Sequence, residues 1–232
     1  MTIKTTIPGT FTGALAATLP RYLHSLPTGT VARRHVALTT QQPIGSTIAS
    51  IPDLTGTYAA MSGGNKPALA VDGPDVYARF DGASNYLGAT DGTTVAPRTA
   101  FYVARFRGVP PSGKFYFIFN AGPWMTLANN GNIATYTGTS LQYTTLAPGT
   151  GWHVFHLTAT AGSLIVGMDN QEVTLTEAAS TGMDFKAQAG GRSDSTAPLA
   201  PVDFAEHITF SGVLTAQQRA DTVRSLRAAY SI

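Results

Sequence analysis

From about residue 68 onward, the chain consists of short hydrophobic runs separated by turn residues. One run places Val76, Ala78 and Phe80 on one face of a strand and Tyr77 and Arg79 on the other, the pattern of a half-buried strand. The other runs are rich in β-branched and aromatic residues, with Gly, Pro, Asn and Asp between them, as turns favour. The pattern predicts strands at 76–80, 99–107, 115–119, 124–128, 133–137, 141–145, 152–160, 164–168, 172–175 and 202–210.

Strands that recur roughly every 8–12 residues are typical of an antiparallel β-sandwich or barrel. The chain shows no alternation of strands with helices and no repeat of fixed period. One helix is predicted near the C-terminus, because Thr215 and Gln218 have the spacing of a capping box and Val223 and Leu226 lie on an apolar stripe. We expect this helix over 215–230, packed against the sandwich.

Residues 1–45 differ from the rest of the chain, since they are rich in Thr, Pro and Gly. Apolar residues between Phe11 and Leu26 recur near helical spacing, but Pro20 interrupts them. A short broken helix and an extended arm both fit this pattern, and we expect a partly extended N-terminal arm over 1–45, followed by one domain over 46–232. The apolar stretch 11–19 contains polar residues and precedes a proline, so we expect no cleaved secretion signal.

Composition narrows the class of protein. The 232 residues are 43% hydrophobic and 12% charged, and they include no cysteine. This excludes a disordered chain, a disulfide scaffold, a thiolate zinc site and a cysteine nucleophile. The longest apolar runs, such as Phe115–Phe119, fall far below the ~20 residues that cross a bilayer, so we expect no membrane insertion.

The net charge of +2 is unevenly distributed. Residues 1–52 carry only basic charges, among them Arg21, Arg33 and Arg34, whereas 53–210 have an acidic excess. A basic arm suits an acidic protein surface or nucleic acid. Because its few arginines are not clustered with aromatics as in a nucleic-acid patch, we expect docking on a partner protein through these three arginines, and no nucleic acid. A charge pattern without function remains the alternative.

Five collinear segments resemble concanavalin A-like, laminin G-type jelly rolls. Ile48–Gly56 resembles their "ssWpDlSGng" segment, although Ile51 stands where those proteins usually have Trp. The segments that resemble their later blocks are Val76–Leu87, Thr99–Phe106, Trp152–Asn170 and Phe204–Tyr230. The resemblance covers residues 46–232 and implies an all-β fold, a two-sheet antiparallel jelly-roll sandwich with one C-terminal helix.

Some concanavalin A-like proteins are glucanases, whose chemistry needs a pair of carboxylates. The related glucanases supply these as E-x-D-x-E on one strand, and this chain has no such pattern. Strict alternation would place Asp203 and Glu206 on opposite faces of their strand. His153 and His156 also have opposite parity, so they cannot bind one metal from that strand. Phosphate-binding loops and a nucleophile elbow are absent from the sequence, and we expect a protein that is not an enzyme.

Calcium is the inorganic candidate, because laminin G-type folds often hold a cation with Asp, Asn and carbonyl oxygens. The available oxygens are those of Asp81, Asn85 and Asp169. Asp81 and Asp169 stand in turn sequences, where an acidic side chain caps nearby backbone. We therefore expect no cofactor and no metal, with calcium as the alternative.

Sugar binding is the ligand class that the aromatic residues suggest. Trp124, Tyr136 and Tyr143 fall in successive short strands around a turn that contains Asn130. Aromatic rings can lie against sugar rings, and the Asn side chain can hydrogen bond. An ordinary sandwich core has the same pattern, and we expect Trp152 to belong to the core.

Compact jelly rolls with a short arm look like capsid decoration or minor tail proteins of tailed phages. This resemblance implies a non-enzymatic virion protein, located in the virion, whose arm docks on neighbouring virion subunits and whose jelly roll faces outward. Such a protein is expected to form a homo-oligomer in the assembly. The alternative is a carbohydrate-binding or adhesion module of a bacterial or phage surface protein, which would bind a host-surface glycan.

Overall fold

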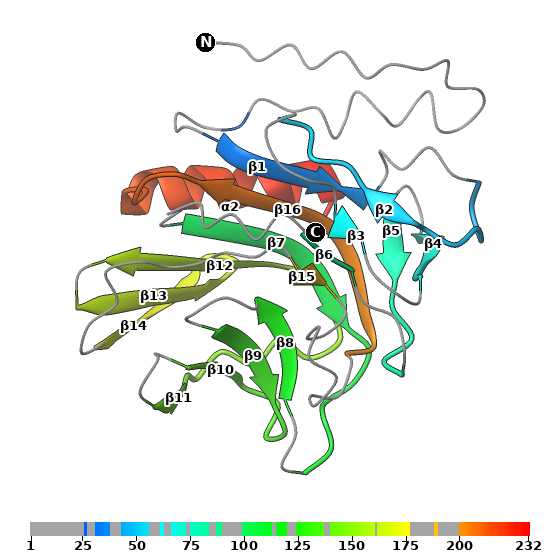
Figure 1. The fold of residues 1–232 in the computed structure, drawn as a ribbon. Coiled ribbons are helices and arrows are strands. Elements are labelled where there is room, and N and C mark those ends of the chain that lie inside the picture. Colours follow the sequence, from blue (N-terminus) through cyan, green and yellow to red (C-terminus); the bar gives the residue numbers. More distant parts are fainter. Residues whose placement is uncertain are drawn as a thin grey trace.

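In the part of the chain that the structure describes, the protein is a layered β structure with a single helix (Figure 1). The computed structural model describes residues 26, 31–37, 43–55, 61–62, 66–72, 75–83, 87–89, 99–112, 115–119, 124–136, 140–160, 162–176, 188–189 and 200–232. The strands of these ranges are β1 Val31–Val36, β2 Ser50–Ile51, β3 Met61–Ser62, β4 Ala68–Asp72, β5 Asp75–Arg79, β6 Leu87–Ala89, β7 Thr99–Phe106, β8 Phe115–Phe119, β9 Trp124–Ala128, β10 Ile133–Tyr136, β11 Leu141–Tyr143, β12 His153–Thr160, β13 Ser163–Met168, β14 Gln171–Thr176, β15 Gln188–Ala189 and β16 Val202–Phe210. The helix is α2, Ala216–Tyr230.

An eight-stranded sheet forms one layer, which we call the main sheet. Its order is β14-β13-β12-β7-β16-β5-β4, and β1 also pairs with β16. Every pairing in it is antiparallel. All nine residues of β16 are buried, so this strand lies in the centre of the protein.

Two four-stranded sheets form the second layer. Their orders are β11-β10-β9-β8, called here the small sheet, and β15-β6-β3-β2. They adjoin where β15 contacts β8. Tyr116 of β8 stacks on Phe106 of β7 with ring centroids 6.4 Å apart, which joins the small sheet to the main sheet. This confirms the predicted antiparallel sandwich (Figure 1).

The predicted strands are all present, with ends that differ by one or two residues. The structure differs from the sequence-based expectation at β1, which lies within the predicted arm of residues 1–45. Val31–Val36 pair with β16 from Phe210 to Glu206, so this segment belongs to the main sheet and is not an appendage. The other parts of the predicted arm up to residue 42 lie outside the described residues, apart from Leu26 and Ala37.

The C-terminal helix begins as predicted. The Thr215 side chain accepts a hydrogen bond from the Gln218 backbone, and the Gln218 side chain accepts one from the Thr215 backbone. This reciprocal pair satisfies two backbone donors that a helix start leaves open. Val223, Leu226 and Tyr230 are buried. Among the described residues no helix is both long and apolar enough to cross a membrane.

One ion pair and one hydrogen bond to a carboxylate fix the helix on the main sheet. Arg219 donates from Nε and Nη2 to both carboxylate oxygens of Glu172 on β14, each at 2.7 Å. Tyr230 donates its hydroxyl to Oε2 of Glu206 on β16, also at 2.7 Å. Such charge-assisted bonds are stronger than neutral ones, so both ends of the helix are tied to strands.

A β-bulge corrects the expectation for Asp203 and Glu206. The pairing of β16 with β7 shifts between Phe204 and Glu206, so that Asp203 faces Arg105 and Glu206 faces Val103. Paired residues of neighbouring strands point to the same face, and Arg105 and Val103 are two residues apart. The two carboxylates therefore lie on one face, the face that carries α2, because the bulge inserts one extra residue.

His156 occupies the space that a glycine leaves open on the next strand. His156 of β12 pairs with Gly167 of β13, and its buried ring stacks on Phe101. A Cβ atom at Gly167 would lie 1.8 Å from His156 Nε2. The close approach of the ring therefore requires glycine at this position.

We expect Gly167→Ala to lower the free energy of unfolding by about 1–3 kcal/mol, because overpacking displaces a buried ring. Urea denaturation measures this change. Gly212→Ala is the matched control, since a Cβ there meets nothing within 4 Å. Equal stabilities of the two variants would contradict the packing argument.

We expect Tyr230→Phe to destabilise the protein by about 1–3 kcal/mol, because a buried carboxylate oxygen of Glu206 loses its donor. Urea denaturation with Tyr143→Phe as control tests this, since Tyr143 is exposed. A loss no larger than that of the control would show that the Tyr230 hydroxyl adds nothing to helix docking.

Candidate functional site

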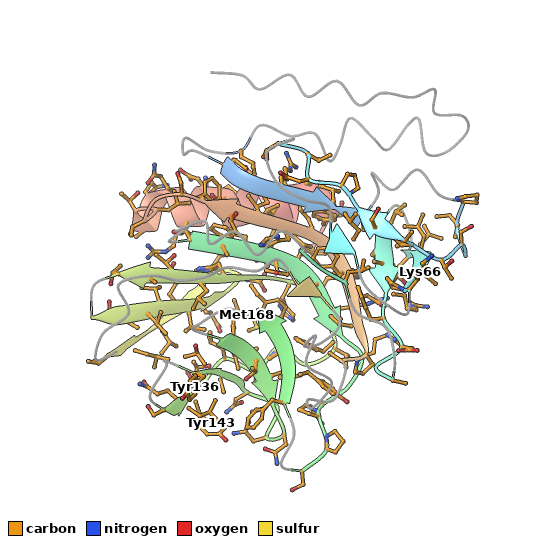
Figure 2. The ribbon with its side chains drawn as sticks, in the orientation of Figure 1. Lys66, Tyr136, Tyr143 and Met168 are labelled. Carbon is orange, nitrogen blue, oxygen red and sulfur yellow. The ribbon has the colours of Figure 1, made fainter. Side chains whose placement is uncertain are left out.

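The predicted aromatic platform lies on the small sheet. Tyr136 of β10 pairs with Trp124 of β9, and Tyr143 of β11 pairs with Ala134, two residues from Tyr136. By this register Tyr136 and Tyr143 share a face, and Figure 2 shows them near one another over β10 and β11. Tyr143 is 51% exposed and Tyr136 is partly exposed. The Trp124 side chain lies outside the described part of the structure.

The platform faces away from the main sheet. Tyr116, Leu127 and Ile133 occupy the opposite face of the small sheet, because they pair with one another across its strands and Tyr116 stacks on the main sheet. The two tyrosines therefore stand on the outer surface of the sandwich. Tyrosine combines an apolar ring with a polar hydroxyl, which suits a ligand with both C–H and O–H groups.

Asn130 is separated from the aromatic pair. It lies in the turn that joins β9 to β10, whereas Tyr136 and Trp124 pair at the other end of the same hairpin. Its Oδ1 accepts a hydrogen bond of 3.0 Å from the backbone of Asn132. This side chain therefore stabilises the turn, and the structure does not bring it to the tyrosines.

The three arginines predicted to dock on a partner have different positions. Arg21 lies outside the described residues, and of Arg33 only the backbone is described, opposite Thr209. Arg34 donates from Nε to Oε1 of Glu206 at 2.6 Å, and its side chain is 12% exposed. Arg34 thus neutralises a buried carboxylate of its own domain and is largely withdrawn from solvent.

A second cluster, which sequence reasoning missed, surrounds Asp203 on the face of the main sheet that carries α2. We call it the arginine cluster, and its members are Asp72, Tyr77, Arg79, Arg105, Arg107, Trp152 and Asp203. Asp203 is fully buried and accepts from Arg79 Nε at 3.0 Å and Arg105 Nε at 2.8 Å. No motif in the sequence predicts this cluster, because its members come from β4, β5, β7 and β16, from the residue after β7 (Arg107) and from the residue before β12 (Trp152).

Aromatic rings support the guanidinium groups of this cluster. Arg105 lies over the Trp152 ring at 5.1 Å and over the Tyr77 ring at 5.4 Å, within the range of cation–π attraction. Tyr77 packs edge-on against Trp152 at 5.2 Å. Hydrogen bonding to Asp203 raises the pKa of Arg79. Trp152, predicted to be core, is only partly buried.

The acidic residues considered for calcium serve local structure. Asp81 Oδ1 accepts from the backbone of Ala83 at 2.8 Å, and Asp169 Oδ1 accepts from the backbone of Val154 at 3.0 Å. Asn85 lies outside the described residues. Within the described ranges no group of three or more His, Cys, Asp or Glu side chains is placed to hold a metal ion.

The two histidines of β12 have contrasting environments. His153 Nδ1 lies 2.7 Å from Asp169 Oδ2, and its Nε2 lies 2.7 Å from the Pro148 carbonyl oxygen. Burial alone disfavours the imidazolium, but the bond to Asp169 prevails and raises the pKa of His153. His156 is buried beside Glu172 and Arg219, and burial lowers its pKa to about 4. The sequence predicts that the two histidines lie on opposite faces of β12. Their partners on β7 confirm this prediction, because Ala104 and Phe101 are three residues apart and point to opposite faces of the sheet.

Comparison with known proteins shows similarity in structure alone. No family model and no curated protein matches the sequence. A sialidase from Trypanosoma rangeli in complex with sialic acid matches with a TM-score of 0.66 and 11% identity, over 90% of this chain and 34% of that one. The chain thus spans about a third of the sialidase chain it matches.

Two further structures are similar. Domain 4 of AbnA, an extracellular arabinanase of Geobacillus stearothermophilus in complex with arabinotriose, matches with a TM-score of 0.60 and 14% identity, over 84% of this chain and 98% of that one. A botulinum neurotoxin type C, described as interacting with two ganglioside molecules, matches with a TM-score of 0.52 and 12% identity, over 78% and 51%. At these identities the matches show a shared β-sandwich fold.

The histidine environments predict a pH dependence of stability. The pKa of His156 falls from 6.5 to about 4 on folding. Its contribution to the free energy of unfolding is therefore complete above pH 6.5 and is lost as the pH falls towards 4. Urea denaturation should show a slope of up to about 1.4 kcal/mol per pH unit from this group in that window, which His156→Gln should lack.

The matched control is His153→Gln. The pKa of His153 is raised on folding. Its contribution to the free energy of unfolding is therefore present below pH 6.5 and is lost as the pH rises through the pKa of the folded protein. This variant should keep the acid-side slope that the His156 variant loses. An unchanged slope in His156→Gln would contradict the assignment.

Proposed function

We propose that the protein is a non-catalytic carbohydrate-binding domain, which presents the face of Tyr136 and Tyr143 to a saccharide. The observation that carries this proposal is the register of the small sheet, which places both rings on one outer face. A ring pair of this kind offers apolar surface to sugar C–H groups and hydroxyls to sugar O–H groups.

The similar structures support this class of ligand. AbnA domain 4 was solved with arabinotriose, and this chain covers 98% of it; the neurotoxin is described with gangliosides. The functions of those proteins are carried to this chain as a proposal, since fold alone does not determine function.

The carboxylates of β16 support a non-catalytic role. Glycoside hydrolysis uses two carboxyl groups that flank the scissile bond. Asp203 is held by Arg79 and Arg105, and Glu206 by Arg34 and Tyr230. Both carboxylates are buried, so neither stands open to a substrate.

The role in a tailed-phage virion, which the sequence resemblance favoured, receives no support from the similar structures. The docking arm, the virion subunits as partners, the assembly into a homo-oligomer and the virion location therefore stay predictions. The host-surface glycan of the alternative fits the function proposed here.

A glycan array followed by calorimetric titration tests the proposal. We expect Tyr143→Ala to weaken saccharide binding roughly tenfold or more, as truncation of an aromatic anchor does, and Tyr143→Phe to keep most of the affinity because the ring remains. Val213→Ala is the control, since Val213 is also exposed but lies just before α2. Absence of binding to every saccharide, or equal binding by Tyr143→Ala, would overturn the proposal.

A further inference from the structure

We propose that the arginine cluster around Asp203 is a second binding site, which takes the carboxylate of a uronate-containing saccharide. The inference rests on the proposed function and names an acidic class of ligand for it. The site lies on the opposite side of the sandwich from Tyr136 and Tyr143, because its residues share the α2 face of the main sheet.

The first observation is a surplus of positive charge around a buried carboxylate. Arg79, Arg105 and Arg107 all approach Asp203, Arg107 with Nε at 3.4 Å from Oδ1. One guanidinium is enough to balance one carboxylate. Asp72 accepts from Arg105 at 2.7 Å but is itself more than half exposed. The three arginines and the two aspartates, Asp72 and Asp203, give the cluster a formal charge of +1. This charge suits a ligand with a single negative charge.

The second observation is that the free donors lie at the surface. Arg79 binds Asp203 with Nε and Nη2, the fork along one edge of the guanidinium, which leaves Nη1 directed away from Asp203. Arg107 uses Nη2 for the carbonyl oxygen of Phe80. Among the described residues Nη1 of neither arginine has a hydrogen-bond partner, and the two side chains are 42% and 35% exposed.

The third observation is that the donors are held in place before any ligand arrives. Asp203 and the Tyr77 hydroxyl bind Arg79, and Asp203, Asp72 and Tyr77 bind Arg105. Arginine loses much rotamer freedom when it binds a ligand. Here the buried carboxylate has already restricted that freedom, so a carboxylate ligand meets donors of fixed geometry.

The aromatic residues indicate that the carboxylate belongs to a sugar. Trp152 is partly exposed, with Arg105 over its ring and Tyr77 packed edge-on against it, so an apolar aromatic group adjoins the guanidinium groups. A uronate presents a C–H face and a carboxylate on one ring. Asp72 would repel a chain with several charges per residue, and this disfavours sulfated or phosphate-rich polymers.

The test compares uronate oligosaccharides with their methyl esters by calorimetric titration. The probes are galacturonate and glucuronate tetramers. The ester keeps the sugar and removes the charge, so we expect the acid form to bind at least tenfold more tightly to the wild-type protein. Its affinity should fall as salt rises, because the donors are partly exposed.

Arg79→Gln and Arg107→Gln should each weaken binding of the acid form about tenfold and leave the affinity for the ester unchanged. Arg224→Gln is the matched control, because it changes the net charge equally but removes a 72% exposed arginine of α2. Equal binding of acid and ester by the wild-type protein, or an equal loss in Arg224→Gln, would overturn the assignment. Tighter binding of a heparin tetramer would also overturn it.

The two proposals fail in different ways. If neutral saccharides bind in a Tyr143-dependent manner but the acid form has no advantage, the acidic site is wrong and the proposed function stands. If no saccharide binds, neutral or acidic, both are wrong. The acid–ester comparison on the wild-type protein decides the matter even where an arginine variant does not fold, which a thermal melt detects.

Discussion

The structure depends on the neutralisation of two carboxylates buried in its central strand. Asp203 and Glu206 have no solvent exposure that could stabilise a charge, and an unpaired charge in such a place costs several kcal/mol. Their partners come from elsewhere in the chain: Arg34 from β1, Arg79 from β5, Arg105 from β7 and the Tyr230 hydroxyl from α2. The two acids thus require β1, β5, β7 and the helix to assemble on β16.

The bulge in β16 makes this arrangement feasible. Without the extra residue, Asp203 and Glu206 would point to opposite faces, and one of them would lie between the two layers, among aromatic side chains such as Tyr102 and Phe204. With the bulge, both face the side of the main sheet where arginines and the helix can reach them. This also explains why the pair does not resemble a catalytic pair: each carboxylate is a structural acceptor.

The sandwich leaves two outer surfaces of different chemistry. The small sheet presents tyrosines, whereas the main sheet, beside the helix, presents partly exposed arginines next to Trp152. In the two proposals, the tyrosines take the uncharged surface of a sugar and the arginine cluster takes a negative charge. The two surfaces need not bind the same saccharide chain.

The sequence by itself determined the strands from β5 onward, apart from β6 and β15, and the capped helix, because alternation, turn residues and the Thr215–Gln218 capping box act within a few residues. It also predicted that Tyr136 and Tyr143 lie in successive strands, and these strands are neighbours in the small sheet. The two-residue strands β2, β3 and β15 are too short to show a period. Only the tertiary structure decided the pairing of β1 with β16, the bulge at Phe204–Glu206 and the arginine cluster. These join residues up to 172 positions apart. A carboxylate needs such partners only after the folded sheet has removed it from water.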